Sequence, residues 1–183
     1  MNFGYTQWYN AFNTRENIMY RISFSSLLIL LLFSIFSLTT HAGQVPKPLL
    51  PLTLANKMVA AAMQQCERDG FQVSIAVVDR SGVVQAQVRM DGAGAHTIES
   101  SFRKAYTSAS LKLPTMKMAQ IAAKDPELQG LHHMANNILL LGGGLPIIIN
   151  GEVVGGIGVG GAPGAHFDEV CAEAGLKSIQ ENK

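Results

Sequence analysis

Beyond residue 42 this sequence has few aromatic side chains and no net charge. The first 42 residues hold the only tryptophan and nine of the thirteen aromatic residues, so the later aromatic residues are only Phe71, Phe102, Tyr106 and Phe167. The same 42 residues hold two of the fourteen Lys and Arg residues and one of the thirteen Asp and Glu residues, which leaves the remainder formally neutral. Without a basic field, we expect no binding to nucleic acid or to anionic lipid.

Residues 19–42 have the organisation of a secretory signal peptide. Arg21 supplies a short basic start, residues 27–38 form an apolar core, and Thr40 and Ala42 place small residues before a cleavage point. Met19 is a better start for such a peptide than Met1, and the polar residues 1–18 are then a mis-called leader.

An uncleaved membrane anchor is the alternative interpretation. Residues 22–38 number only 17 and include five serines, which is short and polar for a segment that needs about 20 apolar residues. We therefore expect cleavage, a periplasmic or secreted location, and no membrane span in the mature protein. Residues 43–52, with three prolines, are expected to form an extended lead-in to one domain over residues 53–183.

Cysteine is scarce, and both copies lie in the mature region. In an oxidising compartment an even number of cysteines favours a disulfide between Cys66 and Cys171. Two small buried thiols are the alternative, because free cysteine is among the most buried residue types. The sequence leaves both interpretations open.

Hydrophobic periodicity and turn signals predict an α+β domain. Expected strands cover 72–79, 83–90, 138–141, 146–149 and 153–159. Expected helices cover 53–69, 97–111, 115–123 and 167–179, with a short helix or turn over 126–135. Hairpin turns at Arg80-Ser81-Gly82 and Asn150-Gly151 favour an antiparallel sheet with helices packed on it. In the second helix, we expect Ile98, Phe102, Ala105 and Ala109 to be buried.

Two short motifs suggest enzyme classes that their contexts disfavour. Ser101-Phe-Arg-Lys104 matches the acylating motif of penicillin-recognising enzymes, but the partner motifs Ser-Asp-Asn and Lys-Thr-Gly are absent. Gly156-Ile-Gly-Val-Gly-Gly161 matches a dinucleotide fingerprint, but it follows a hairpin and does not lie between a strand and a helix. We interpret its glycines as positions of tight turns or close backbone approach.

No histidine pair has the spacing of a structural zinc site. His96, His132 and His133 are instead candidates for a single axial ligand to a haem iron, as are Met116 and Met134.

Arg89, Asp91 and Lys104 are the most suggestive polar set. Arg89 ends a strand on its polar face, Asp91 opens the next loop, and Lys104 lies on the following helix away from its expected apolar stripe. Fixed cationic donors suit a carboxylate ligand, including the propionates of haem. The alternative is an Arg–Asp pair that closes the loop beside a solvated Lys104.

Several segments, read in order, resemble the GlcG/HbpS family. They are Val77-Val-Asp-Arg-Ser-Gly82, Arg89-Met-Asp-Gly92, Lys104-Ala-Tyr-Thr-Ser108, Pro114-Thr115, Gly143-Gly-Leu-Pro146, Gly155-Gly-Ile-Gly-Val-Gly-Gly161, Asp168 and Ala172-Glu-Ala-Gly175. Together they span nearly all of residues 53–179.

This resemblance implies a profilin-like fold, with a five-stranded antiparallel sheet flanked by helices, and assembly into a homo-oligomer. It implies haem as the cofactor, with a sensor protein as a further partner. Within the resembling segments, Thr107, Thr115, Gly143 and Gly144 join Arg89, Asp91 and Lys104 as candidate ligand contacts.

Two functions agree with these features. The first is an exported haem-binding protein for storage, scavenging or sensing. The second is an enzyme that degrades haem or acts on a small carboxylate such as a 2-hydroxy acid. Because the residues form no clear acid–base arrangement, we favour the binding protein.

Overall fold

The computed structural model describes residues 48–180. The predicted leader, signal peptide and most of the lead-in lie outside these residues. Within them, no helix is both long enough and apolar enough to cross a membrane.

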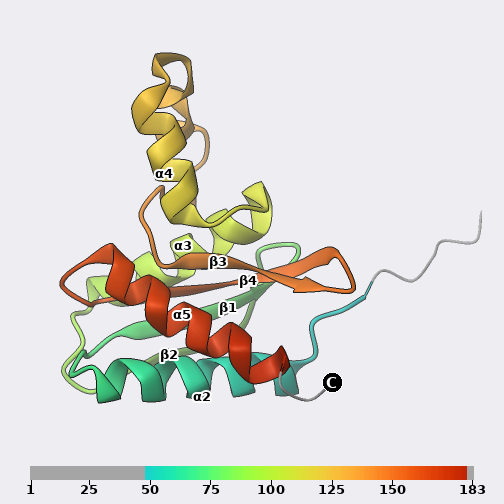
Figure 1. Ribbon diagram of the computed structural model, residues 1–183, viewed down its shortest axis with the longest axis vertical. Helices are drawn as coiled ribbons and strands as arrows, with labels where there is room; N and C mark the ends of the chain where they lie inside the picture. Colours follow the sequence, from blue (N-terminus) through green and yellow to red (C-terminus); the bar gives the residue numbers. More distant parts are fainter. Residues whose placement is uncertain (1–47, 181–183) are drawn as a thin grey trace, which may run out of the picture. The chain divides into compact units, whose positions relative to one another are not determined.

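A four-stranded antiparallel sheet forms the centre of the domain (Figure 1). Its strands are β1 (Ser74–Asp79), β2 (Val84–Arg89), β3 (Gly144–Ile149) and β4 (Glu152–Gly160), in the order β2-β1-β4-β3. Both predicted hairpins are present. Asn150 and Gly151 adopt positive φ angles of 52° and 81°, which suits the tight turn between two right-twisted strands.

Helices cover both faces of this sheet (Figure 1). Helices α2 (Leu52–Arg68) and α5 (Ala165–Gln180) lie together on one face, and α3 (His96–Leu111) lies on the other. Helix α4 (Thr115–Lys124) and the 3-10 helix η2 (Pro126–His133) extend away from the sheet around a small apolar cluster of their own. The predicted mixed fold, with helices flanking an antiparallel sheet, is confirmed.

The predicted strand over residues 138–141 is wrong, and the described sheet has four strands where five were expected. Side chains of α3 take the hydrogen bonds that a neighbouring strand would have provided. Arg103 Nη2 donates to the Ile138 carbonyl at 2.7 Å, and the Leu139 amide donates to Thr107 Oγ1 at 2.8 Å. Ile138 and Leu140 are buried in the apolar cluster beside α4.

Helix α3 buries only part of the face that its apolar residues predict. Ala105 and Ala109 are buried as expected, but Ile98 is 42% exposed and Phe102 is half-buried. Ser101 and Lys104 are buried in their place. The cause lies in the sheet, where glycines of β4 face this helix. A Cβ atom on Gly156, Gly158 or Gly160 would collide with α3, so the two backbones approach closely and only a narrow helix face fits. The glycine motif of β4 is therefore structural, as the sequence indicated.

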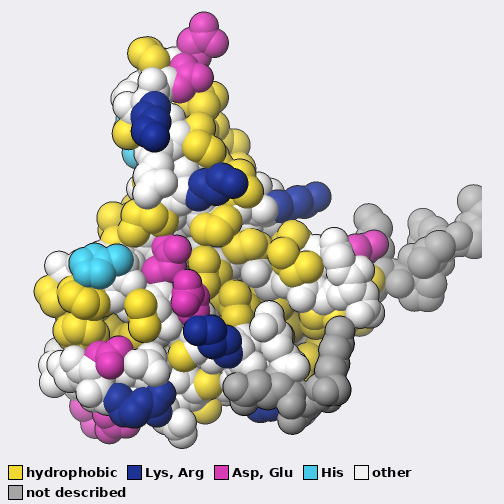
Figure 2. All heavy atoms as spheres, viewed as in Figure 1, with side chains coloured by type: hydrophobic (Ala, Val, Ile, Leu, Met, Phe, Trp, Pro, Cys, Tyr) yellow, Lys and Arg dark blue, Asp and Glu magenta, His cyan; other side chains and the backbone are white. Residues whose placement is uncertain are grey.

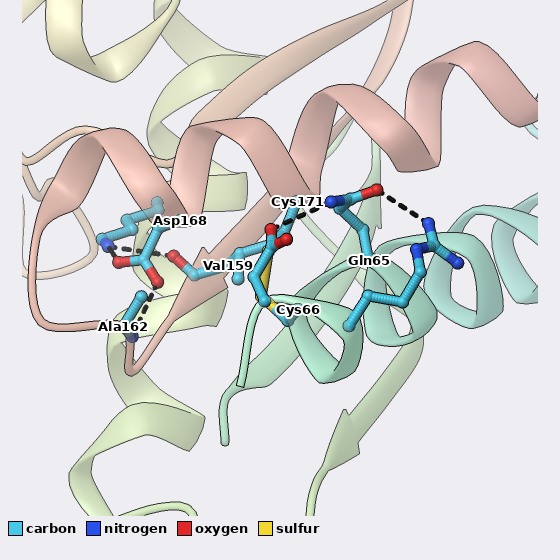
Figure 3. The surroundings of a disulfide bond; sticks show 9 residues. Gln65, Cys66, Val159, Ala162, Asp168 and Cys171 are labelled. Atoms are coloured by element: carbon cyan, nitrogen blue, oxygen red, sulfur yellow. Dashed lines mark hydrogen bonds and ion pairs between the residues drawn. A yellow bond between two sulfur atoms is a disulfide. The ribbon is translucent and has the colours of Figure 1, made fainter. Parts of the chain in front are cut away.

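Cys66 and Cys171 form a disulfide that joins α2 to α5 (Figure 3). Their Cα atoms are 5.5 Å apart and both residues are fully buried. The two helices also meet at Gly175, where a Cβ atom would lie only 2.9 Å from the Met58 carbonyl oxygen. Of the two interpretations that the sequence left open, the structure therefore has the disulfide and not two free buried thiols.

Candidate functional site

A groove of about 500 Å³ opens between the end of α2 and the end of β2. Apolar side chains from both elements line it, together with one arginine, one glutamine and two acidic residues. The lining residues are Met63, Glu67, Gly70, Phe71, Gln72, Val88, Arg89, Met90 and Asp91. This volume lies within the range of small-molecule sites in proteins.

The end of α2 fixes one wall of the groove. The Gly70 amide donates to the Glu67 carbonyl, and the Phe71 amide donates to the Cys66 carbonyl at 2.8 Å. With Gly70 at a φ of 82°, these bonds form a Schellman motif, the helix ending that turns the chain back through a left-handed glycine. Because Cys66 is held by the disulfide, the turn that carries Phe71 is tied to α5 as well.

Aromatic side chains of α5 pack behind Phe71. The rings of Phe71 and Phe167 lie 5.0 Å apart, and the imidazole of His166 lies 3.9 Å from the Phe167 ring. Phe71 itself lines the groove, and Phe167 packs against it with the two rings tilted by 46°.

The loop after β2 fixes the opposite wall. Gly92 adopts a φ of 83°, and the Ala93 amide donates to the Met90 carbonyl. Arg89 Nη1 donates to the Ala93 carbonyl at 2.6 Å and closes the loop. Since a guanidinium has five N–H donors, Arg89 keeps donors that can reach a ligand. Arg89 and Asp91 are both exposed and both line the groove.

Lys104 does not join Arg89 and Asp91 as a third polar group. Its side chain is only 2% exposed, and Nζ donates to Asp168 Oδ2 at 2.7 Å and to the Val159 carbonyl at 2.9 Å. The expectation of a solvated lysine, or of a free cation beside Arg89, is wrong. The reason is that Lys104 lies on the side of α3 that packs against the sheet.

The Lys104–Asp168 ion pair ties α3 to α5. Asp168 also accepts a hydrogen bond from the Ala162 amide at 3.0 Å (Figure 3). Burial raises the pKa of the Asp168 carboxyl, and Lys104 and the Ala162 amide oppose this effect. Burial also raises the pKa of its neighbour Glu169, which accepts a hydrogen bond from the Gly143 amide.

The glycine loop before β3 is packed against this ion pair. A Cβ atom on Gly143 would lie 2.6 Å from Asp168 Cβ and 2.8 Å from the Val159 carbonyl oxygen. The Gly144 amide donates to Thr115 Oγ1 at 2.9 Å, and Thr107 holds Leu139 in the same way. Thr107, Thr115, Gly143 and Gly144 are therefore buried in protein contacts, and none of them lines the groove.

The candidate iron ligands lie elsewhere on the domain. His96 begins α3 and is exposed, and His132 and His133 are exposed on η2 with ring centroids 6.4 Å apart. Met134 is 55% exposed just after η2, whereas the Met116 side chain lies against Gly142. Among the described residues, no three His, Cys, Asp or Glu side chains form a cluster that could hold a metal ion.

Sequence reasoning placed Arg89 and Asp91 correctly at one loop but missed the apolar residues of the groove. Met63, Phe71, Val88 and Met90 come from two elements that only the folded chain brings together. The rarity of aromatic residues was the one available signal for Phe71.

The family model described as "Haem degrading protein HbpS-like" matches residues 50–177. The chain belongs to this HbpS-like family. Among solved structures, a double mutant of HbpS from Streptomyces reticuli is 40% identical, with a TM-score of 0.68 over 73% of this chain and 88% of that one. Protein GlcG of Escherichia coli K12 is 28% identical over 123 residues, which are 62% of this chain and 82% of GlcG.

The domain also shares its fold with the PduOC–haem complex. That structure is 24% identical, with a TM-score of 0.67 over 72% of this chain and 96% of that one. The predicted GlcG/HbpS resemblance is thus confirmed.

Proposed function

We propose that this protein is an exported haem-binding protein and that haem binds in the groove between α2 and β2. The observation that carries the proposal is the set of residues that line this groove. The description of the chain's family, which names haem degradation, agrees with it. The complex of PduOC with haem supports haem binding, because that protein has a domain of the same fold.

The groove residues fit haem. A porphyrin requires an apolar surface for its ring and cationic donors for its two propionates. Met63, Phe71 and Val88 supply apolar surface, and Arg89 supplies the cation at the groove's edge. When bound, haem supplies a redox-active iron, while the protein residues bind and orient the ring.

The charge of the groove limits the expected affinity. Glu67 and Asp91 also line it and would repel the propionates. Both are exposed, so water and salt screen their charges. We therefore expect binding that depends strongly on Arg89.

A titration of purified protein with haem tests this function. We expect a saturable shift of the Soret band, and Arg89→Gln should weaken binding roughly 10- to 100-fold, because a hydrogen bond to a charged group contributes about 1.5–3 kcal/mol. Arg80→Gln is the matched control, because Arg80 lies at the other end of the β1–β2 hairpin, where it bonds to the Pro48 carbonyl and pairs with Glu152. No Soret shift at micromolar haem in the unaltered protein would overturn the proposal.

Export is supported by two observations. Residues 19–42 read as a signal peptide, and the buried disulfide is typical of proteins in oxidising compartments. Expression of the full chain in a bacterial host tests it. We expect the mature protein in the periplasm or medium with Gly43 as its first residue, and retention of an uncleaved chain in the membrane would contradict export.

Haem degradation is the second candidate function, since the family description names it. Storage, scavenging or service to a sensor protein requires that bound haem survive. Incubation of the complex with peroxide or a reductant separates the two. Loss of the haem spectrum faster than that of free haem would favour the enzyme.

A further inference from the structure

The groove contains sulfur donors and no imidazole. Of the four histidines in the described region, His96, His132 and His133 lie on α3 and η2, and His166 lies on α5 against Phe167. None of these four lines the groove, whereas Met63 and Met90 both do.

The two methionines come from opposite walls and are held in place. Met63 lies on α2, three residues before the buried Cys66, and Met90 directly follows the last residue of β2. Both are half-buried and pack against the main hydrophobic core. The Met90 amide donates to the Val73 carbonyl at 3.0 Å, which fixes the backbone from which its thioether extends.

The other potential donors of the groove are less suited to iron in haem. Glu67 and Asp91 are exposed carboxylates that remain hydrated, and Gln72 and Arg89 offer no established haem ligand. Methionine is an established axial ligand of haem iron, and it raises the reduction potential. As a soft donor, a thioether also favours the reduced metal.

We propose that this chain ligates haem iron through a methionine thioether, from Met63 or Met90, and so stabilises the ferrous state. The proposal rests on the haem-binding function above and names the ligand at that same site. It replaces the histidines expected from the sequence and moves the methionine ligand from Met116 or Met134 to the groove.

Spectra of the haem complex test the assignment without any activity measurement. The full-length protein and its Met63→Leu, Met90→Leu and double variants are saturated with haem. Their absorption, magnetic circular dichroism and reduction potentials are then compared. Leucine keeps the apolar volume, so the variants should fold and bind haem. We expect one single variant, and the double variant, to lose the low-spin thioether spectrum and to show a lower reduction potential.

Matched controls decide between sulfur and nitrogen ligation. Met134→Leu removes an exposed methionine outside the groove and should leave the spectrum and the potential unchanged. His96→Ala, His166→Ala and the His132→Ala/His133→Ala pair should also leave them unchanged.

The outcomes separate this inference from the proposed function. A Soret shift that persists, with an unchanged spectrum in the Met63→Leu/Met90→Leu variant, would overturn the methionine ligand and leave haem binding intact. Loss of the axial spectrum in a histidine variant would have the same consequence. Absence of any Soret shift in the unaltered protein would overturn both.

Discussion

Breaking the buried ion pair between Lys104 and Asp168 should lower the free energy of unfolding more than removing any surface charge of the domain. Asp168→Asn keeps the size of the side chain but removes the negative charge that balances the Lys104 ammonium. Asparagine also has one acceptor oxygen where Asp168 uses two, so either Lys104 or the Ala162 amide loses its acceptor. Lys104 is 2% exposed, so water cannot replace the lost carboxylate. Removal of one partner of a buried pair typically costs about 3–5 kcal/mol. For a domain of this size, that corresponds to a fall in Tm of roughly 10–20 °C.

Urea unfolding followed by circular dichroism measures this loss, with the disulfide kept intact. Glu173→Gln is the matched control, because Glu173 pairs with Lys177 on the exposed side of the same helix at 3.8 Å. It should change the free energy of unfolding by less than about 1 kcal/mol. The double variant Lys104→Met/Asp168→Leu should recover part of the loss, since neither charge then stays buried. An Asp168→Asn variant as mild as Glu173→Gln would refute the reasoning.

Three further predictions concern the disulfide, the glycine contacts and pH. Replacing Cys66 and Cys171 together by alanine should lower the free energy of unfolding by about 2–5 kcal/mol in urea titrations, because their disulfide closes a long loop, and an unchanged midpoint would contradict this. Gly158→Ala should lower the Tm because its Cβ would meet the α3 backbone, whereas Gly130→Ala, which meets nothing within 4 Å, should not; equal effects would contradict the close packing. Burial raises the pKa of Glu169 in the folded state, so the folded protein binds this proton more tightly than the unfolded chain. The stability from this bound proton is present at low pH and is lost as pH rises through the folded pKa. Chemical unfolding should therefore show that Glu169→Gln becomes more stable relative to the unaltered protein as pH rises from acidic to neutral. A difference in unfolding free energy that does not change with pH would contradict the raised pKa.

Local sequence signals accounted for most of the fold. Turn residues such as Asn150-Gly151 and the periodicity of α2 and α5 depend on short-range chemistry, which the sequence displays directly. The strand predicted for residues 138–141 was wrong because a short apolar run of this length occurs both in strands and in loops. What decided their structure was the pair of α3 side chains, Arg103 and Thr107, that bind their backbone.

The candidate site was harder to predict because it depends on long-range packing. Lys104 looked solvated because its helix was oriented by its largest apolar residues, Ile98 and Phe102. The glycines of β4 instead select the narrow face of α3, and that choice buries Lys104 beside Asp168, 64 residues later in the chain. Figure 2 shows hydrophobic side chains gathered on the face of the domain between α4 and α5, two helices that lie far apart in the sequence.

The location of haem in the groove is tested most directly by nuclear magnetic resonance of the labelled protein during titration with ferric haem. The paramagnetic iron broadens amide signals near it. We predict that the signals of Gly70, Phe71 and Asp91 broaden first, while those of Gly151 and His132 stay sharp. Broadening centred on η2, or at the start of α3, would contradict the account.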